Sequence, residues 1–222
     1  MNYSLNEGRQ EVASAALRNL GFMPGHRVVD LFAGAGGLAY GFRQAGFSVL
    51  AGTDVDPDAC ATFRTNFPEA EAVCGDIRTP SVKEAIFDAA SGADVVVGGP
   101  PCQAFSQMRN HSRLIDDPRN ALYREFVSVV ASVLPRAFLM ENVPGLEQVG
   151  AKAQILEDLS LSGEYLVDAV VLDAADFGVP QTRRRLLFFG VHRSLGADPP
   201  RIEGSGATRF LSLARRNGTY PI

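Results

Sequence analysis

A single cysteine in this sequence follows an apolar run and a stiff Pro-Pro turn. The run is VVVGGPPCQAFSQ at residues 95–107, and its cysteine is Cys102. Three consecutive valines predict a core strand of a parallel sheet, and open α/β sheets bind ligands just beyond the carboxyl ends of their strands. Cys102 is therefore expected at that edge of the sheet, where a thiol can act as a nucleophile.

An acidic residue closes the next predicted strand in the same way. Glu141 opens the segment ENV at 141–143, and neighbouring parallel strands would bring its carboxyl group beside the Cys102 thiol. A pyrimidine held between the two groups suggests conjugate addition: the sulfur attacks ring carbon C6 while the acid hydrogen-bonds N3 and absorbs the developing charge.

Three arginines lead into the last predicted strand, in the segment QTRRR at 181–185. Side chains alternate along a strand, so Arg183 and Arg185 point the same way and Arg184 points to the other face. Two guanidinium groups could hold a base carbonyl, a phosphate or both. Orienting Glu141 and keeping an edge strand soluble are the alternative roles for this pair.

A glycine-rich segment, DLFAGAGGL at residues 30–38, follows the first predicted strand and opens the first helix. Asp54 lies twenty positions after Gly34 and ends the second strand, where a carboxylate can accept both hydroxyl protons of an adenosine ribose. Asp76 ends the third strand and could meet the adenine amino group. This pattern also suits a nicotinamide dinucleotide, and tight strand-to-helix packing is an alternative reason for Gly41 and Gly46.

Composition and charge bound the remaining possibilities. The 222 residues are 46% hydrophobic and 21% charged, which is typical of a globular enzyme-sized unit. The net charge of −4 does not favour binding to a polyanion, so any contact with a nucleic acid must use local basic patches. The longest apolar runs, 127–134 and 186–191, are too short to cross a bilayer, and the polar start has no signal-peptide core. We therefore expect no membrane partner and a cytoplasmic protein, nucleoid-associated if the source is bacterial.

The three cysteines and three histidines show neither paired nor metal-type spacing. We accordingly expect no disulfide framework and no metal site. Cys60 and Cys74 lie on an apolar helix and strand, so both are expected to be buried structural thiols. Asp56 and Asp58 are expected to be helix-start acids, and His111 a solvated loop residue.

Short apolar runs alternate with helical patterns along most of the chain. We expect strands at 27–32, 47–53, 70–74, 94–98, 137–140, 165–172 and 185–191, and helices at 7–20, 37–45, 57–66, 82–90, 119–134 and 151–161. Alternating strands and helices pair in parallel through right-handed crossovers, whereas the last two strands have no helix between them and suggest an antiparallel hairpin. The predicted fold class is α/β: a doubly wound, mostly parallel, Rossmann-like sheet with an antiparallel edge hairpin. Gly, Pro and Ser are frequent at 194–206, so we expect a catalytic domain over 1–192 and a linker with a short tail over 193–222.

Seven ordered motifs together resemble the DNA (cytosine-5)-methyltransferases, a family that uses S-adenosylmethionine. They are DLFAGAGG, TDVDPDA, GDI, GGPPCQAFSQ, DDPRNALY, ENV and QTRRR, and the match as a whole runs from about residue 28 to residue 191. The resemblance implies that Cys102 is the covalent nucleophile, that Glu141 contacts N3, and that Arg183 and Arg185 anchor the flipped cytosine and its surroundings. It implies a cofactor pocket lined by Phe32, Ala33, Gly34, Gly37, Leu38, Asp54, Val55, Asp76, Ile77, Pro101 and Leu122. The substrate, double-stranded DNA with a flipped cytosine, would be contacted by Gln103, Ser106, Arg119, Asn142 and Gln181.

The chemistry that this resemblance implies needs a thiolate rather than a metal. Cytosine C5 is too poor a nucleophile to take a sulfonium methyl directly, and addition of the Cys102 thiolate at C6 makes it enamine-like. The target base must also leave the duplex, which costs roughly a few kcal/mol. The polar segment 103–119 is expected to be a mobile loop that closes over DNA phosphates.

The sequence departs from the family pattern after its last predicted strand. Such enzymes normally continue with a long target-recognition region and two further motifs, whereas residues 193–222 resemble neither. We therefore expect a split or truncated enzyme, in which a second polypeptide supplies target recognition. The alternatives are methylation of tRNA, other RNA or a free nucleotide at C5 of cytosine, and an inactive S-adenosylmethionine-binding relic. The setting that the resemblance implies is a restriction–modification system.

Overall fold

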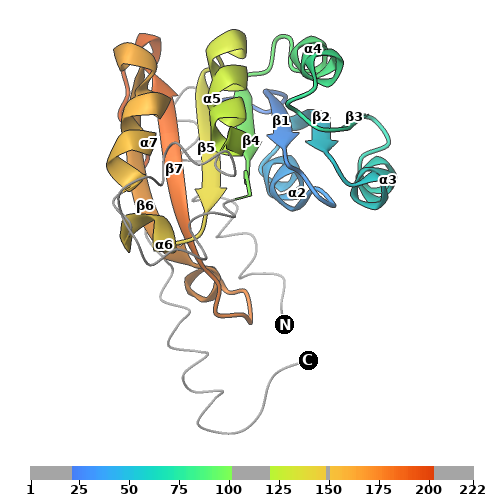
Figure 1. Cartoon of the computed structure of the whole chain (residues 1–222). Helices are drawn as coiled ribbons and strands as arrows, with labels where there is room; N and C mark the ends of the chain where they lie inside the picture. The colour runs from blue at the N-terminus through green and yellow to red at the C-terminus, as the bar shows by residue number, and fades with distance from the viewer. Residues whose placement is uncertain (1–21, 102–120, 149–150, 203–222) are drawn as a thin grey trace, which may run out of the picture.

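The strands of this protein form one seven-stranded sheet in the order β3-β2-β1-β4-β5-β7-β6 (Figure 1). The structure is a computed structural model and describes residues 22–101, 121–148 and 151–202. The strands are β1 (Arg27–Leu31), β2 (Ser48–Asp54), β3 (Glu71–Cys74), β4 (Val95–Gly98), β5 (Ala137–Asn142), β6 (Tyr165–Asp173) and β7 (Arg184–His192). The α-helices are α2 (Gly37–Gln44), α3 (Pro57–Asn66), α4 (Pro80–Ala89), α5 (Ala121–Val133), α6 (Gly145–Gln148) and α7 (Ala151–Ser160).

The pairing confirms the predicted fold class. Strands β1 to β5 pair in parallel, whereas β7 runs antiparallel to both β5 and β6. The expected hairpin is therefore present, and its second strand joins the sheet while β6 forms the edge. All seven expected strands are found, with ends that differ by at most two residues.

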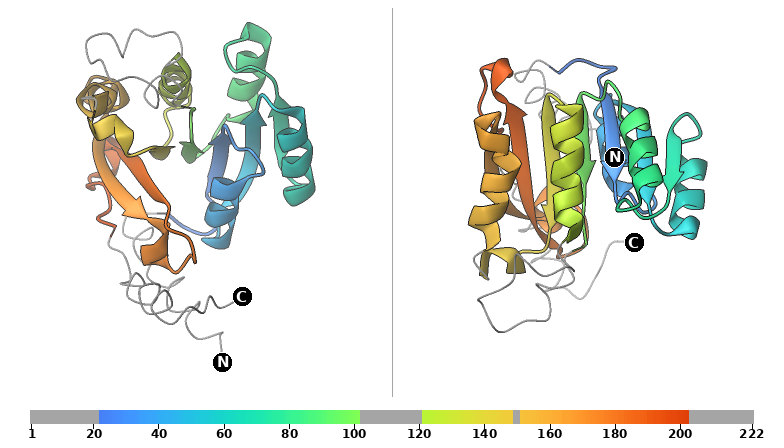
Figure 2. Two further views of the ribbon diagram at one scale, coloured as in Figure 1. Left: turned by 60° about the horizontal axis from the view of Figure 1, so that its bottom comes forward. Right: turned by 45° about the horizontal axis from the view of Figure 1, so that its top comes forward.

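Helices cover the two faces of the sheet unequally (Figure 2). We call the face that carries Val29 and Val96 the first face, and the face that carries Val28 and Val97 the second face. Helices α4, α5 and α7 lie on the first face, and α2 and α3 lie on the second face. Because β1 and β4 are covered on both sides, all of their residues except Arg27 are buried, and β4 is a continuous apolar run, as is typical of buried parallel strands.

The start of α3 shows how the local sequence sets a helix end. Asp56 is the N-cap, and its carboxylate accepts a hydrogen bond from the Asp58 backbone N–H at 2.8 Å. Pro57 follows at the first helical position, where its missing N–H costs nothing. This confirms the expectation that Asp56 and Asp58 are helix-start acids.

Some expectations are corrected or fall outside the described residues. Cys60 is buried as expected, but Cys74 is exposed because it is the last residue of the short strand β3, so its predicted burial was wrong. The short helix α6 and the 3-10 turn at Ala174–Phe177 were not predicted. The predicted helix at 7–20 and the first residues of the one at 119–134 lie outside the described residues. The domain boundary after residue 192 stays a prediction, although Leu195 and Ala197 still pack against the core.

A glycine in β7 gives a test of the packing on the first face. A Cβ atom at Gly190 would lie 2.1 Å from the Phe138 ring. That ring is 2% exposed and packs against Phe126 and Tyr165, so it cannot move aside. We expect Gly190→Ala to lower the free energy of unfolding by about 1–3 kcal/mol, as overpacking does.

The matched control is Gly41→Ala in α2. A Cβ atom at Gly41 meets nothing within 4 Å, so alanine should stabilise this helix by about 0.5–1 kcal/mol. Chemical denaturation of both variants would measure the two changes. Equal stability of Gly190→Ala and the parent chain would contradict the packing described for β5 and β7.

Candidate active site

The loop between β1 and α2 turns through three left-handed backbone conformations. Phe32, Gly34 and Gly36 have φ angles of 58°, 55° and 91°. At Gly36 a Cβ atom would also lie 2.3 Å from the Phe67 ring of the helix cap of α3, so only glycine fits there. The loop is thereby pressed against α3 and keeps its backbone at the carboxyl edge of the sheet.

Asp54, the last residue of β2, holds this loop. Its Oδ2 accepts the Gly34 N–H at 2.8 Å, and its Oδ1 accepts the Asp56 N–H at 3.0 Å. The Ala33 N–H donates to the carbonyl of Thr53 at 2.8 Å, which ties the loop to the same strand end. Each carboxylate oxygen of Asp54 keeps a lone pair for a further donor. The structure thus brings Asp54 to the loop as the sequence predicted, and its contact with a ribose stays a prediction.

A second carboxylate, Asp30, was given no role by the sequence. Asp30 lies in β1 and is 1% exposed; its Oδ2 accepts the Ala39 N–H at 2.9 Å. The N-cap of α2 is Gly36, which has no side chain, so Asp30 satisfies a donor of the first helical turn instead. Its Oδ1 has no hydrogen-bond partner in the described part of the chain. Burial raises the pKa of Asp30 to about 7, and the Ala39 bond only partly opposes that shift.

Asp30 could have been found from one sequence signal. It is a charged residue within an apolar strand, immediately before a glycine-rich turn, and such residues are almost never buried without a partner.

At the end of β3, Asp76 is paired within its own turn. Arg78 donates to both carboxylate oxygens, at 2.9 Å from Nε to Oδ1 and 2.5 Å from Nη2 to Oδ2. These bonds hold the pKa of Asp76 at about 2. Ile77 beside it is buried, whereas Val55, which follows Asp54, is 65% exposed. The predicted contact of Asp76 with an adenine amino group would have to share this carboxylate with Arg78.

Glu141 lies at the carboxyl end of β5 and is held by the two predicted arginines. The Arg185 Nε lies 2.5 Å from Glu141 Oε1, and an Arg183 guanidinium nitrogen lies 3.7 Å from the same oxygen. The side chain of Glu141 is 23% exposed. Arg183 and Arg185 therefore reach the same group, as their alternation predicted, and Arg184 is exposed.

The other carboxylate oxygen of Glu141 faces the end of β4. A Cβ atom at Gly99 would lie 3.1 Å from Glu141 Oε2. Next to it, the Asn142 side chain is 5% exposed; its Nδ2 donates to the Pro100 carbonyl at 3.1 Å, and its Oδ1 accepts the Val143 N–H at 2.8 Å. Asn142 thus fixes the turn that precedes Cys102. Its predicted contact with substrate would come in addition to this structural role.

The remaining predicted residues divide into two groups. Outside the described residues lie Cys102, Gln103, Ser106, His111 and Arg119, and with them the loop expected at 103–119. The structure places the others around the same edge of the sheet: Gly37 opens α2, Leu38 is half-buried against the second-face core, Pro101 is exposed after β4, Leu122 is half-buried at the start of α5, and Gln181 is exposed before β7.

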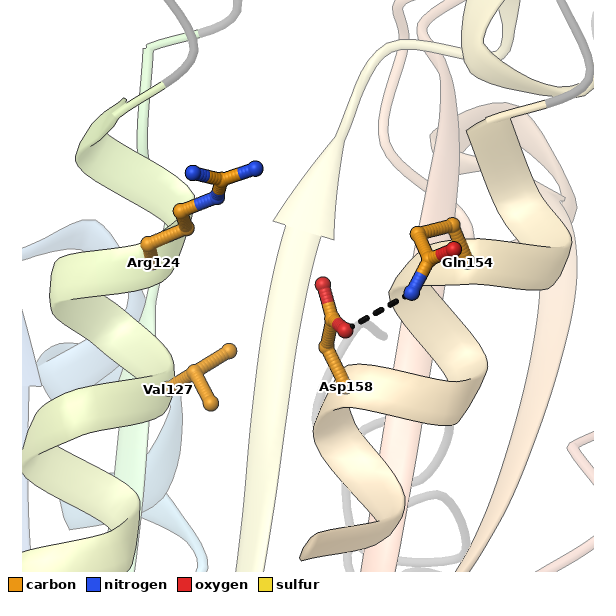
Figure 3. A pocket seen from close by; sticks show the side chains of 4 residues that line it. All are labelled: Arg124, Val127, Gln154 and Asp158. Carbon is orange, nitrogen blue, oxygen red and sulfur yellow. Dashed lines mark hydrogen bonds between the residues drawn. The ribbon is translucent and has the colours of Figure 1, made fainter. Parts of the chain in front are cut away.

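A hollow of about 300 Å³ lies elsewhere, between α5 and α7 (Figure 3). Arg124, Val127, Gln154 and Asp158 line it. The Asp158 carboxylate accepts hydrogen bonds from Gln154 Nε2 and the Tyr123 hydroxyl, both at 2.9 Å. These bonds join the two helices, and the hollow has neither the glycine loop nor the strand ends of the candidate site.

Residues 22–101, 121–148 and 151–202 contain no helix that is long and apolar enough to span a membrane. The same ranges contain no cluster of three or more His, Cys, Asp or Glu side chains that could hold a metal ion.

The sheet with its reversed β7 is that of the Rossmann-like methyltransferases. A crystal structure described as a DNA modification methyltransferase encoded within a prophage of E. coli superposes with a TM-score of 0.64 at 34% sequence identity, covering 81% of this chain and 52% of that one. DNMT2 of Spodoptera frugiperda superposes with a TM-score of 0.61 at 22% identity, covering 80% of this chain and 53% of that one, and shows the fold alone.

Sequence comparison gives the family. The model of the C-5 cytosine-specific DNA methylases matches residues 26–212. The type II methyltransferase M.AgeI of Thalassovita gelatinovora is 43% identical over 180 residues, which are 78% of this chain and 41% of the relative. The chain therefore belongs to the C-5 cytosine-specific DNA methylase family, which confirms the resemblance drawn from its motifs.

The chain matches only part of most of these relatives. It covers 41% of M.AgeI but 71% of the type II methyltransferase M.AquIA of Picosynechococcus sp., which is 40% identical over 178 residues. The residues that the family model matches, 26–212, include the glycine loop and the strand ends described above.

The pH dependence of stability tests the environment of Asp30. The unfolded chain releases this proton near pH 3.9, whereas the folded chain keeps it up to about pH 7. Between these values the folded state binds more protons, so the contribution of Asp30 to stability falls as pH rises. Asparagine can accept the same Ala39 bond without titrating. We expect Asp30→Asn to gain stability relative to the parent chain between pH 5 and pH 8, measured as the difference in Tm. Parallel Tm curves over that range would contradict the assignment.

Proposed function

We propose that this protein transfers a methyl group from S-adenosylmethionine to C5 of cytosine in DNA. The observation that carries the proposal is Glu141, whose Oε1 is held by Arg183 and Arg185 and whose Oε2 faces Gly99, three residues before Cys102. The glycine loop lies at the same edge of the sheet, at the end of β1, which is the neighbour of β4. A cofactor group and a pyrimidine could therefore meet at one edge.

The glycine loop and the neighbouring strand ends fit the nucleoside part of S-adenosylmethionine. Asp54 keeps lone pairs for two ribose hydroxyls, and the exposed Val55 offers an apolar surface beside it for adenine. Phe32, Ala33, Gly34, Gly37, Leu38, Asp76, Ile77, Pro101 and Leu122 complete the proposed pocket. When bound there, S-adenosylmethionine supplies an electrophilic methyl group on a sulfonium sulfur.

The residues of the chain would act on the base in two complementary ways. The Cys102 thiolate forms a bond to C6, the electrons of the C5–C6 double bond shift through the ring toward N3, and N3 takes a proton from the Glu141 carboxylic acid, which leaves C5 enamine-like. C5 would then accept the methyl group, with S-adenosylhomocysteine as the leaving group. A base removes the C5 proton, N3 returns its proton, and the C6–sulfur bond breaks to restore the double bond and the thiolate. Arg183 and Arg185 fix the Glu141 carboxyl group, so that Oε2 remains directed toward the base.

Methylation of DNA also requires contacts with the duplex and recognition of the target sequence. Contacts with double-stranded DNA around the flipped cytosine are proposed for Gln103, Ser106, Arg119, Asn142 and Gln181. The relatives M.AgeI and M.AquIA are type II methyltransferases, so we propose the same restriction–modification setting for this protein. A second polypeptide that supplies target recognition is the further partner that we propose. RNA and free nucleotides remain the alternative substrates, and an inactive relic the alternative state.

The proposed chemistry is tested by trapping on 5-fluorocytosine. A base cannot remove the fluorine at C5 as it removes the proton of cytosine, so turnover stops at the covalent adduct. Mass spectrometry then locates the adduct on a peptide. Duplex DNA, RNA and the free nucleotide, each containing 5-fluorocytosine, are incubated with S-adenosylmethionine and the chain. Each reaction is run with and without the product of the neighbouring gene, and we expect an adduct at Cys102 with duplex DNA when that product is present.

Two cysteine variants serve as controls for the trapping experiment. Cys102→Ser should give no adduct, whereas Cys74→Ser, which removes an exposed thiol outside the proposed chemistry, should keep it. An adduct without the second polypeptide would contradict the split enzyme but support the chemistry. An adduct with RNA alone, or none despite measurable binding of S-adenosylmethionine, would contradict DNA methylation.

The arginine pair provides a graded test of the same site. Arg185→Ala removes a charge-assisted hydrogen bond to Glu141, typically worth about 1.5–3 kcal/mol. We expect methyl transfer to slow by about 10- to 100-fold, with binding of S-adenosylmethionine unchanged. Arg184→Ala is the matched control, because that side chain is exposed on the other face of β7. Equal rates for the two variants would show that Arg185 does not position Glu141.

A further inference from the structure

Two of the three cysteines lie in α3 and β3, outside the chemistry proposed for Cys102. Cys60 lies in α3 and is 2% exposed, whereas Cys74 is the last residue of β3 and is exposed. Side chains alternate along β3: Val73 packs in the first-face core, so Cys74 points, like Ala72, to the second face. Helix α3 covers that face and contacts β3 (Figure 1). Both thiols therefore lie in the layer between this helix and the end of this strand.

The main-chain carbonyl of Asp54 links the two cysteines. Cys60 Sγ donates to this carbonyl at 3.4 Å, and the Gly75 N–H, directly after Cys74, donates to it at 2.9 Å. Asp54 and Cys74 are also partners in the register of β2 and β3. Burial, and after it a hydrogen bond with the Cys74 side chain, raises the pKa of the Cys60 thiol to about 11. The two thiols are thus direct neighbours, and both are free.

The two thiols differ in their access to solvent. Cys74 is exposed, so an oxidant dissolved in water reaches its sulfur, whereas the burial of Cys60 shields that sulfur from direct attack. Oxidation of an exposed thiol gives a sulfenic acid, and a sulfenic acid condenses with a neighbouring thiol to a disulfide. An exposed thiol with a buried thiol beside it therefore has the arrangement that such a two-step oxidation needs.

We infer that Cys60 and Cys74 are an oxidisable pair, which forms a disulfide when a hydroperoxide reaches Cys74. The Cys74 sulfur attacks one oxygen of the peroxide, the O–O bond breaks, and the thiol proton passes to the departing oxygen. The products are a sulfenic acid and an alcohol or water. The Cys60 sulfur then attacks the sulfenic sulfur: the S–S bond forms, the S–O bond breaks, and the departing hydroxide takes the Cys60 proton as water. The two thiols together lose two electrons, which the peroxide gains.

The disulfide acts on the cofactor through Asp54, a consequence that rests on the proposed function. The Cys60 sulfur no longer donates to the Asp54 carbonyl, and the S–S bond, about 2.05 Å long, draws the first turn of α3 toward the end of β3. Both changes displace Asp54, whose carboxylate holds the Gly34 N–H of the glycine loop at 2.8 Å. We expect the oxidised chain to bind S-adenosylmethionine about 10-fold more weakly, as the loss of one hydrogen bond to the ribose would produce.

The disulfide is measured directly in the Cys102→Ser chain, which keeps only Cys60 and Cys74. Hydrogen peroxide is added, free thiols are alkylated, and the intact mass and the peptides are analysed by mass spectrometry. We expect one intramolecular disulfide between residues 60 and 74 that dithiothreitol reverses, and the same link in the parent chain. Disulfides between two copies, oxidation of Cys74 to a sulfinic acid while Cys60 stays a thiol, or two thiols that remain free would overturn the inference.

Cys60→Ser in the Cys102→Ser chain is the matched control for the effect on the cofactor, because serine keeps a donor for the Asp54 carbonyl but forms no disulfide. Calorimetry measures the affinity for S-adenosylmethionine before and after peroxide. We expect a loss that dithiothreitol restores in the chain with both cysteines, and no change in the control. Equal losses in the two chains, or an unchanged affinity in a chain that carries the disulfide, would overturn the link to the cofactor. A reduced chain that binds no S-adenosylmethionine would contradict the proposed function, while the disulfide measurement still decides the inference.

Discussion

The reversed direction of β7 is the constraint on which the candidate active site depends. Because β7 runs antiparallel to β5, its first residues lie beside the last residues of β5. Arg185 is thereby delivered to Glu141, although the two are far apart in the sequence. A parallel strand in the same place would carry its arginines to the opposite edge of the sheet. The hairpin is thus the device that adds cationic side chains to an edge otherwise made from parallel strand ends.

Two carboxylates at the glycine loop do different work because their surroundings differ. Asp54 is partly exposed and accepts backbone hydrogen bonds on both oxygens. Asp30 is buried, has one oxygen bonded and the other bare, and holds its proton to about pH 7. Asp54 holds the loop from a partly exposed position at the end of β2, whereas Asp30 anchors the first turn of α2 from the core. The same residue type therefore holds a loop in one place and caps a helix in the other.

Most of the architecture could be predicted from sequence, because the spacing of apolar residues within a short segment distinguishes a strand from a helix. The runs at β1 and β4 and the missing helix between β6 and β7 were sufficient for the sheet and its edge hairpin. The convergence of Glu141 with Arg183 and Arg185 also followed, since alternation and strand adjacency are general properties of sheets. The contacts of Asp30 and Asn142 did not follow, because a buried polar side chain acquires its partner only when tertiary packing is complete. The exposure of Cys74 was missed although the end of its strand was predicted, because the local sequence does not reveal that β3 is an edge strand of the sheet.

The order of strands in the sheet also constrains how the chain is synthesised and folded. Strand β1 lies between β2 and β4, so it has only one neighbour until Val95–Gly98 have left the ribosome. Contacts between residues so distant in sequence form late and slowly. During that interval β1 presents an unpaired edge rich in valine, and such edges promote association between nascent chains. When β4 has been synthesised, it pairs with the free side of β1. The same stage of synthesis brings out the Pro-Pro turn that precedes Cys102.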